Sequence, residues 1–146
     1  MWLLSTARAE LHFFSAPETV IGGYAILSHT WCSHEQSFQE TQALREQCKA
    51  TGANPRELSF TKIRECCVLA ESRGYQWLWV DTCCIDKMSS TELSEAINSM
   101  FRWYSCAEVC FAYLEDVPSD CVLDADRKST RLNSSHSGES RMPSSA

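Results

Sequence analysis

Five short apolar stretches along the chain have the length and composition of β-strands. Residues 1–6 and 10–14 are two brief runs separated by the tripeptide ARA, a pattern typical of a β-hairpin. The stretch 24–31 opens with a continuous apolar run, and 75–81 and 109–118 have the same form. Continuous apolar runs favour strands that are buried on both faces. We therefore predict an N-terminal hairpin followed by three core strands.

Between the core strands, apolar residues recur at the three- and four-residue spacing of helices. The polar segment after the first core strand is predicted to contain a short helix at 38–49, stopped by Gly52. A second helix is predicted to begin at Ser59, as its cap, and to end at Gly74. The predicted inward face of this second helix comprises Phe60, Ile63, Cys67 and Ala70.

A third helix is predicted at 89–108, and the residues expected on its apolar stripe are Leu93, Ile97, Met100 and Tyr104. The order strand, helix, strand, helix, strand implies a parallel α/β sheet with right-handed crossovers. Ligands of such sheets bind outside the carboxyl ends of the strands. The predicted strand ends carry Ser28, His29, Asp81, Glu115 and Asp116.

The charge and hydropathy of the chain exclude two kinds of partner. The net charge is −6, and the part before Asp126 is more acidic still, with nine basic and 17 acidic residues. Such an acidic surface repels a phosphate backbone, so no nucleic-acid partner is expected. No apolar run approaches the roughly 20 residues of a membrane helix, and the N-terminus has no basic region of a secretory signal. Neither a membrane partner nor secretion is expected.

The cysteines, nine in all, raise the question of a metal or redox site. Cys66–Cys67 and Cys83–Cys84 are adjacent pairs, whereas zinc and thiol-exchange sites favour two intervening residues. Neighbours on a strand also point to opposite faces. We therefore expect no metal site, and interpret these thiols as small apolar side chains of a reduced, cytoplasmic protein.

The C-terminal segment 126–146 differs in composition from everything before it. It is rich in Ser, Arg and Asn, and its stretch DRKSTRLNSSH resembles the translation of a widely used sequencing-library adapter. We therefore interpret 126–146 as a disordered tail produced by adapter read-through, which takes no part in the fold. The expected domain is 1–125, and we expect the natural protein to continue beyond Ala125.

The acidic residues have structural readings as well as functional ones. Glu92 follows Ser89 at the spacing of a capping box, so its side chain could simply help to start the helix. Asp81 could cap the loop after its strand. A histidine at a strand end, such as His29, is more often a hydrogen-bonded structural residue than a catalyst. The residue types and spacing alone leave these alternatives open.

Three blocks, in this order, carry a family resemblance. They are YAILSHTW, KIRECCVLAESRGYQWLWVDTCCIDK and ELSEAINSMFRWYSCAEVCFAYLEDV, and the match extends over about residues 1–118. Together they resemble the fungal heterokaryon incompatibility (HET) domain. The family's later block, rich in tryptophan, arginine and glutamate, is absent from this chain. The resemblance implies nonself recognition and programmed cell death, and a flavodoxin-like three-layer fold related to the Toll/interleukin-1 receptor (TIR) domain, incomplete at its C-terminal side.

The resemblance also implies a candidate chemistry, because some TIR domains cleave NAD at the nicotinamide–ribose bond with a glutamate. The comparable residue here is Glu92, with Glu95 one turn further on as the fallback. The residues that would line the substrate cleft are Ser28, His29, Trp31, Asp81 and Asp86. NAD would be a substrate, so no bound cofactor is expected. A carboxylate there would stabilise the positive charge that develops on the ribose.

Two hypotheses for the function follow. In the first, the chain is a TIR-like NAD glycohydrolase that signals cell death and is activated by self-association. In the second, the same fold is a non-enzymatic module that assembles with copies of itself or with other death-signalling proteins. In the second hypothesis the acidic residues would only cap helices and loops.

Overall fold

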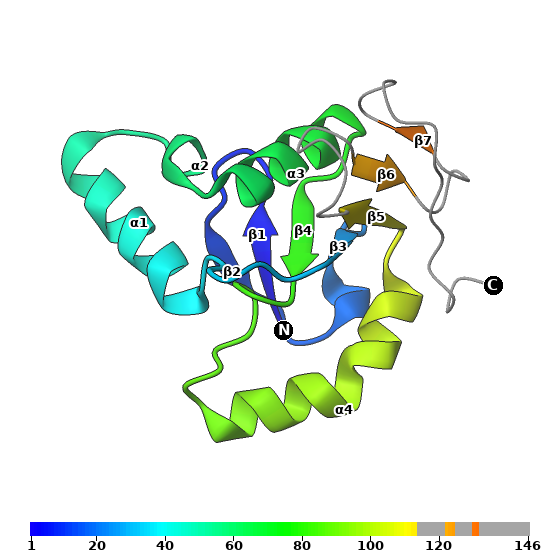
Figure 1. Cartoon of the computed structure of the whole chain (residues 1–146). Helices are drawn as coiled ribbons and strands as arrows, with labels where there is room; N and C mark the ends of the chain where they lie inside the picture. The colour runs from blue at the N-terminus through cyan, green and yellow to red at the C-terminus, as the bar shows by residue number, and fades with distance from the viewer. Residues whose placement is uncertain (114–121, 125–129, 132–146) are drawn as a thin grey trace.

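The computed structural model describes residues 1–113, 122–124 and 130–131 (Figure 1). The elements in chain order are β1 (Trp2–Ser5), β2 (Leu11–Phe13), the 3-10 helix η1 (Pro17–Thr19), β3 (Ala25–His29), α1 (Phe38–Thr51), α2 (Pro55–Leu58), α3 (Thr61–Ser72), β4 (Trp77–Val80), α4 (Ser90–Cys106), β5 (Val109–Tyr113), β6 (Val122–Asp124) and β7 (Thr130–Arg131). The strands form one sheet in the order β2-β1-β4-β3-β5-β6-β7. The α/β class predicted from the sequence is confirmed.

The centre of the sheet is parallel and its margins are antiparallel. β3 pairs in parallel with β4 on one side and β5 on the other. β1 and β2 form the predicted hairpin, which joins the sheet through an antiparallel β1–β4 pair. β6 and β7 extend the other margin, again antiparallel. The expectation of a parallel sheet therefore holds for the three core strands and is wrong for the sheet as a whole. The two strands of a short hairpin must run antiparallel to each other, so the hairpin cannot extend a purely parallel sheet.

The helices α3 and α4 cover opposite faces of the sheet. Trp79 of β4 contacts the rings of Trp103 and Tyr104 in α4, so its side of the sheet faces α4. His29 of β3 points to the other side, because its side chain contacts Lys62 of α3. In the view of Figure 1, α3 lies above the strands and α4 below them. The sheet is thus enclosed between two helical layers, and its residues alternate between them.

Helix α3 buries the face that the sequence predicts. Ile63 is 1% exposed, and Cys67 and Ala70 are fully buried. Its start differs from the prediction: Phe60 occupies the N-cap position, whereas the Ser59 hydroxyl donates to the carbonyl of Pro55 in the preceding turn. The separate helix α2, which ends just before Ser59, recruits that hydroxyl. The predicted Ser59 cap is therefore wrong by one residue.

Helix α4 buries its predicted stripe only in part: Leu93, Met100 and Tyr104 are partly buried against the core, and the helix is turned toward Ala96 and Trp103. Ala96 and Trp103 are the buried residues, whereas Ile97 is 64% exposed and Phe101 is 77% exposed. Trp103 fixes this rotation, because its ring packs edge-on against Trp79 and its carbonyl accepts the Tyr24 hydroxyl. The prediction that Ile97 faces the sheet is wrong.

The predicted thiol packing is confirmed for the two adjacent pairs. Cys66, Cys67, Cys83 and Cys84 are all buried as free thiols in the core. Burial raises the pKa of the Cys66 thiol well above its usual range. Such thiols carry little thiolate and are poor nucleophiles.

Three further sequence predictions concern the strand-end acids, the C-terminal segment and membrane-spanning helices. Glu115 and Asp116 lie outside the described residues. Of the segment 126–146, the structure describes Thr130–Arg131, which forms β7 and pairs with β6. None of the helices among the described residues is both long and apolar enough to cross a membrane.

The start of α1 provides a local test of stability. Ser37 caps this helix through a capping box: its hydroxyl accepts from the Glu40 amide at 3.1 Å, and the Glu40 carboxylate accepts from the Ser37 amide at 2.9 Å. Replacing Ser37 with Ala leaves the Glu40 amide without that acceptor. We expect a loss of about 1 kcal/mol in the free energy of unfolding, measured by urea denaturation. A loss below about 0.3 kcal/mol would show that the cap contributes little.

Candidate functional site

The carboxyl ends of β3 and β4 lie side by side, as the predicted edge site requires. Leu27 pairs with Val80 in the parallel register. β4 ends at Val80, while β3 continues to His29 in its pairing with β5. His29 and Asp81 meet there: Nε2 of His29 lies 2.8 Å from Oδ1 of Asp81. The structure thus brings two of the predicted residues into direct contact.

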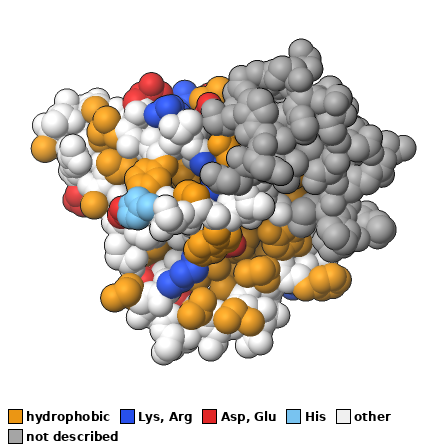
Figure 2. Space-filling model, viewed as in Figure 1, with side chains coloured by type: hydrophobic (Ala, Val, Ile, Leu, Met, Phe, Trp, Pro, Cys, Tyr) orange, Lys and Arg blue, Asp and Glu red, His pale blue; other side chains and the backbone are white. Residues whose placement is uncertain are grey.

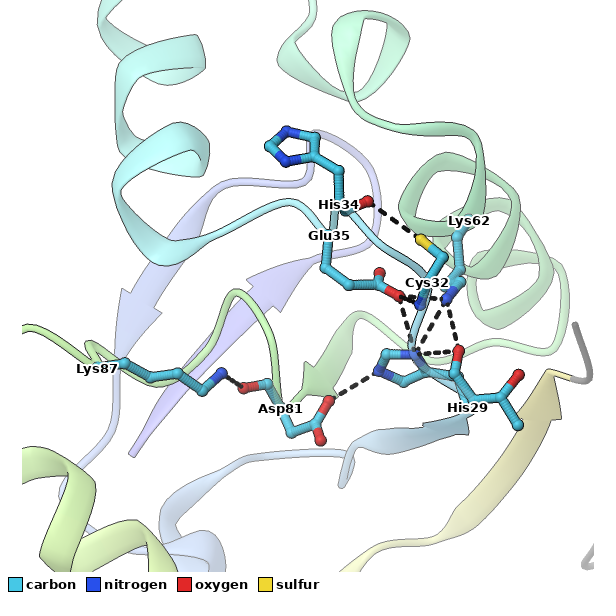
Figure 3. Close-up of polar contacts among 8 residues, drawn as sticks. His29, Cys32, His34, Glu35, Lys62, Asp81 and Lys87 are labelled. Carbon is cyan, nitrogen blue, oxygen red and sulfur yellow. Dashed lines mark hydrogen bonds and ion pairs between the residues drawn. The ribbon is translucent and has the colours of Figure 1, made fainter.

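A buried lysine joins this pair from the other side of the imidazole (Figure 3). Lys62, in the first turn of α3, places its Nζ 3.1 Å from Nδ1 of His29 and 3.0 Å from the carbonyl oxygen of Thr30. Its third partner is Oε2 of Glu35, at 2.8 Å. The side chains of His29, Lys62 and Glu35 are 1%, 9% and 8% exposed. The four side chains of His29, Lys62, Glu35 and Asp81, here called the edge network, link β3, α3, β4 and the loop after β3.

The loop after β3 stabilises the charge of Glu35. Burial on its own would raise the pKa of this carboxyl, but hydrogen bonds from Lys62 and from the Cys32 backbone outweigh burial and lower it. The Cys32 amide donates to Glu35 Oε2 at 2.7 Å. Glu35 is therefore the anion that accompanies the buried Lys62 ammonium.

Trp31 lies at the same edge and is partly open to solvent. Its ring stacks on His29 with the centroids 5.9 Å apart and the planes 13° apart, yet the residue is 55% exposed. The Lys87 ammonium lies 4.9 Å from the Trp31 ring and donates to the Asp81 carbonyl oxygen at 2.5 Å. Burial lowers the pKa of Lys87, and the nearby Asp81 carboxylate opposes that shift. An aromatic surface and a cation thus flank the His29–Asp81 pair.

Two predicted cleft residues have other contacts. Asp86 accepts from Gln39 of α1 at 2.7 Å and from the Met88 amide at 3.1 Å, so it organises the loop between β4 and α4. Ser28 hydrogen-bonds to Tyr104 on the α4 face, where burial raises the pKa of the tyrosine to about 12. The structure does not bring either residue into contact with the edge network.

Glu92 and Glu95 line a separate cavity on the β1 side of β4. This cavity has a volume of about 220 Å³, and it is lined by Met1, Trp2, Phe13, Cys84, Ile85, Glu92, Glu95, Ala96 and Trp103. Trp2 donates from its indole nitrogen to Oε1 of Glu92 at 3.2 Å. No residue of the edge network lines this cavity. The predicted cleft residues therefore divide between two separate sites.

Of the two hydrogen bonds in the capping box expected at Ser89 and Glu92, the structure has one. Ser89 does cap α4, because its hydroxyl accepts from the Glu92 amide at 3.3 Å. The reciprocal bond is missing: the Ser89 amide donates to the carbonyl of Asp86, and the Glu92 carboxylate is turned to Trp2 instead. Helix capping therefore accounts for the Glu92 backbone but not for its side chain.

Sequence reasoning missed Lys62 and Glu35. Lys62 had a detectable signal, because it shares a helical stripe with Cys66 and Leu69, and both of these are buried. A lysine on an apolar stripe is unusual unless it has a partner. Glu35 lies in a polar loop without periodicity, and nothing in the local sequence marks it as that partner.

The parallel core strands, with charged and aromatic side chains at their carboxyl edge, define an α/β protein with an edge site. Comparison with known proteins gives the family: the model described as Heterokaryon incompatibility protein (HET) matches residues 24–145, and the chain belongs to that family. It is similar to the vegetative incompatibility protein HET-E-1 of Podospora anserina, with 48% identity over 112 residues. That match covers 75% of this chain and 8% of the relative, so the chain spans only a small part of it. No solved structure matches the chain.

Proposed function

We propose that the chain acts in fungal heterokaryon incompatibility, as a TIR-like domain that hydrolyses NAD at the nicotinamide–ribose bond. The family description and the name of the similar protein both support a role in incompatibility. The observation that supports the chemistry is the Glu92 carboxylate, which faces an aromatic-lined cavity instead of closing the capping box. Three parallel strands between two helical layers are compatible with the TIR relation.

The cavity suits the reacting part of a dinucleotide. Drug-sized ligands occupy roughly 300–1,000 Å³, so about 220 Å³ suffices for one aromatic ring with part of a sugar. Trp2, Phe13 and Trp103 provide apolar and edge-on contacts for a nicotinamide ring. Breaking the N-glycosidic bond builds positive charge on the ribose, and a fixed carboxylate stabilises that charge. Nicotinamide is a good leaving group, so the step needs no separate general acid.

Glu92→Gln tests this proposal with little change of shape. The amide oxygen can still accept from Trp2, but the negative charge is lost. We expect nicotinamide release from NAD by the purified chain to fall by about 10- to 100-fold, with unchanged thermal unfolding. Glu57→Gln is the matched control, because Glu57 is 64% exposed on α2 and far from the cavity in sequence.

Three results would change this proposal. Loss of activity in Glu95→Gln but not in Glu92→Gln would transfer the role to Glu95. Equal activity in both variants and the control would remove the cavity from the reaction. Cell death in a fungal host with unchanged NAD would exclude NAD hydrolysis as the signal.

The second candidate function is a non-enzymatic assembly module, and the outer face of α4 favours it. Ile97 and Phe101 lie one turn apart and are largely exposed, as is Met88 in the preceding loop. Figure 2 shows apolar side chains gathered in the lower part of the view, where α4 lies in Figure 1. If cell death requires Ile97 and Phe101 but tolerates Glu92→Gln, assembly rather than catalysis is the function.

A further inference from the structure

The edge network has a hydrogen-bonding pattern that fixes where the proton of His29 lies. A lysine ammonium carries three protons and accepts no hydrogen bond. Lys62 has three acceptors within 3.1 Å: Glu35 Oε2, the Thr30 carbonyl oxygen and Nδ1 of His29. Nδ1 must therefore offer its lone pair, since a proton on Nδ1 would face a proton on Nζ. The remaining proton of the neutral imidazole is on Nε2, which lies 2.8 Å from Asp81.

The competing arrangement is a doubly protonated His29. Its Nδ1–H could then point to the Thr30 carbonyl oxygen at 3.3 Å, or to Glu35 at 3.8 Å. That arrangement would place two cations 3.1 Å apart at a site where both side chains are at least nine-tenths buried. Lys87 adds a third positive charge beside Asp81. Mutual repulsion of buried like charges disfavours this arrangement.

The protonated Nε2 of His29 also fixes one oxygen of Asp81, which is partly exposed at the surface. This carboxylate is 25% exposed, and Oδ1 is occupied by the Nε2–H group of His29. Among the described residues, no hydrogen-bond donor contacts Oδ2. A carboxylate with one oxygen fixed and the other open is a suitable acceptor for a sugar hydroxyl. Trp31 lies alongside as an exposed aromatic surface.

We propose that Lys62 is a positioning residue that holds His29 as its Nε2–H tautomer and so orients Asp81 to accept ribose hydroxyls of a dinucleotide. The assignment of the ligand rests on the proposed NAD chemistry, whereas the assignment of the tautomer does not. The edge network is then a second subsite, separate from the Glu92 cavity. Glu35 supplies the anion that pairs with the Lys62 ammonium, and is likewise a positioning residue.

The tautomer can be measured without any activity. The chain is labelled with ¹⁵N-histidine, and long-range ¹H–¹⁵N correlations distinguish a protonated from an unprotonated ring nitrogen. The four histidines are separated by comparison with His29→Asn. We expect an unprotonated Nδ1 and a protonated Nε2 for His29 at about pH 7. In Lys62→Met, Nδ1 faces only the acceptors Thr30 O and Glu35 Oε2, so the proton signal should move to Nδ1.

If Lys62→Met does not fold, the double variant Lys62→Met/Glu35→Gln removes both buried charges and should give the same spectrum. A doubly protonated His29 in the wild type, or an Nδ1–H tautomer, would overturn the proposal. So would a spectrum that Lys62→Met leaves unchanged.

Binding of ADP-ribose, followed by calorimetry, tests the ligand. ADP-ribose has the ribose hydroxyls but lacks the bond to be cleaved. We expect Asp81→Asn and Lys62→Met each to weaken binding by about tenfold or more, with Glu46→Gln, an exposed control, unchanged. For NAD hydrolysis, KM should rise by a similar factor while kcat changes little, since hydroxyl binding acts on substrate and transition state alike.

These measurements separate the two proposals. If the chain releases no nicotinamide but ADP-ribose binding still depends on Lys62, NAD hydrolysis fails and the subsite stands. If nicotinamide is released with the same KM in Lys62→Met, the subsite fails and NAD hydrolysis stands. Absence of ADP-ribose binding in the wild type would overturn the ribose assignment.

Discussion

Ile63→Asp is expected to unfold the chain. Ile63 is 1% exposed on the inward face of α3, in the continuous core that joins this helix to the sheet. An aspartate there would be a buried charge without a partner, and it would leave part of the isoleucine volume empty. We expect a loss of about 4 kcal/mol or more, a large part of the roughly 5–15 kcal/mol by which an ordinary domain is stable. Circular dichroism during urea titration measures the loss directly.

Val68→Asp is the matched control for this prediction. Val68 lies on the same helix but is 46% exposed, so the new carboxylate can remain in water. We expect a change within about 1 kcal/mol. Equal unfolding curves for Ile63→Asp and Val68→Asp would contradict the packing of α3.

The strands and helices could be predicted because their signals are local. β3 lies between β4 and β5 in the sheet, and both of its faces are buried, which accounts for its continuous apolar run. α1 begins at a capping box and ends at Gly52, whose φ of 77° is in the left-handed region that favours glycine. These features depend on residues a few positions apart, so the sequence alone displays them.

The rotation of α4 could not be predicted in the same way, because the helix carries two overlapping apolar stripes. One contains Leu93, Ile97, Met100 and Tyr104, and the other contains Ala96 and Trp103. Periodicity cannot rank stripes that lie about one residue apart. The choice is made by Trp79 and Tyr24, which are far away in the sequence and contact Trp103 in the fold.

In the candidate site too, residues at the strand ends could be predicted from the sequence, and residues contributed by other elements could not. The rule that ligands bind at carboxyl ends of parallel strands leads directly to His29 and Asp81, and their contact confirms the shared edge. The rule says nothing about the helix that covers the edge, so Lys62 was missed. It also treats the edge as one cleft, whereas Glu92 faces the opposite side of β4, toward the N-terminal hairpin.

The edge network can contribute to the free energy of unfolding and to the geometry of the edge. A stability measurement tests the first of these separately from function. Its ion pair is largely buried, and replacing both members of such a pair can leave stability almost unchanged. Removing one member leaves the other charge buried and poorly compensated. The network therefore contributes mainly by fixing the geometry of the edge, while its integrity depends on both charges being present.

Glu35→Gln is accordingly expected to cost about 3 kcal/mol or more at about pH 7, because Lys62 stays buried without its anion. The loss should depend on pH. Hydrogen bonds from Lys62 and Cys32 lower the pKa of Glu35 in the folded state, against the opposing effect of burial. A carboxyl with a lowered folded pKa stabilises the fold above its ordinary pKa of 4.5, and that stabilisation disappears as the pH falls through the folded value. The wild type and the variant should therefore differ most near neutral pH and converge in acid.

Urea denaturation of both proteins at several pH values between about 3 and 7 measures this difference directly. Glu46→Gln is the control, because Glu46 pairs with Lys49 at 3.0 Å but both side chains are more than 60% exposed. Exposed pairs contribute about 0–1 kcal/mol, so this variant should follow the wild type at every pH. A constant gap between the Glu35→Gln and wild-type curves would mean that the ionised carboxylate contributes nothing beyond its shape. Convergence in acid would instead show that the buried Lys62–Glu35 pair holds the edge together through charge.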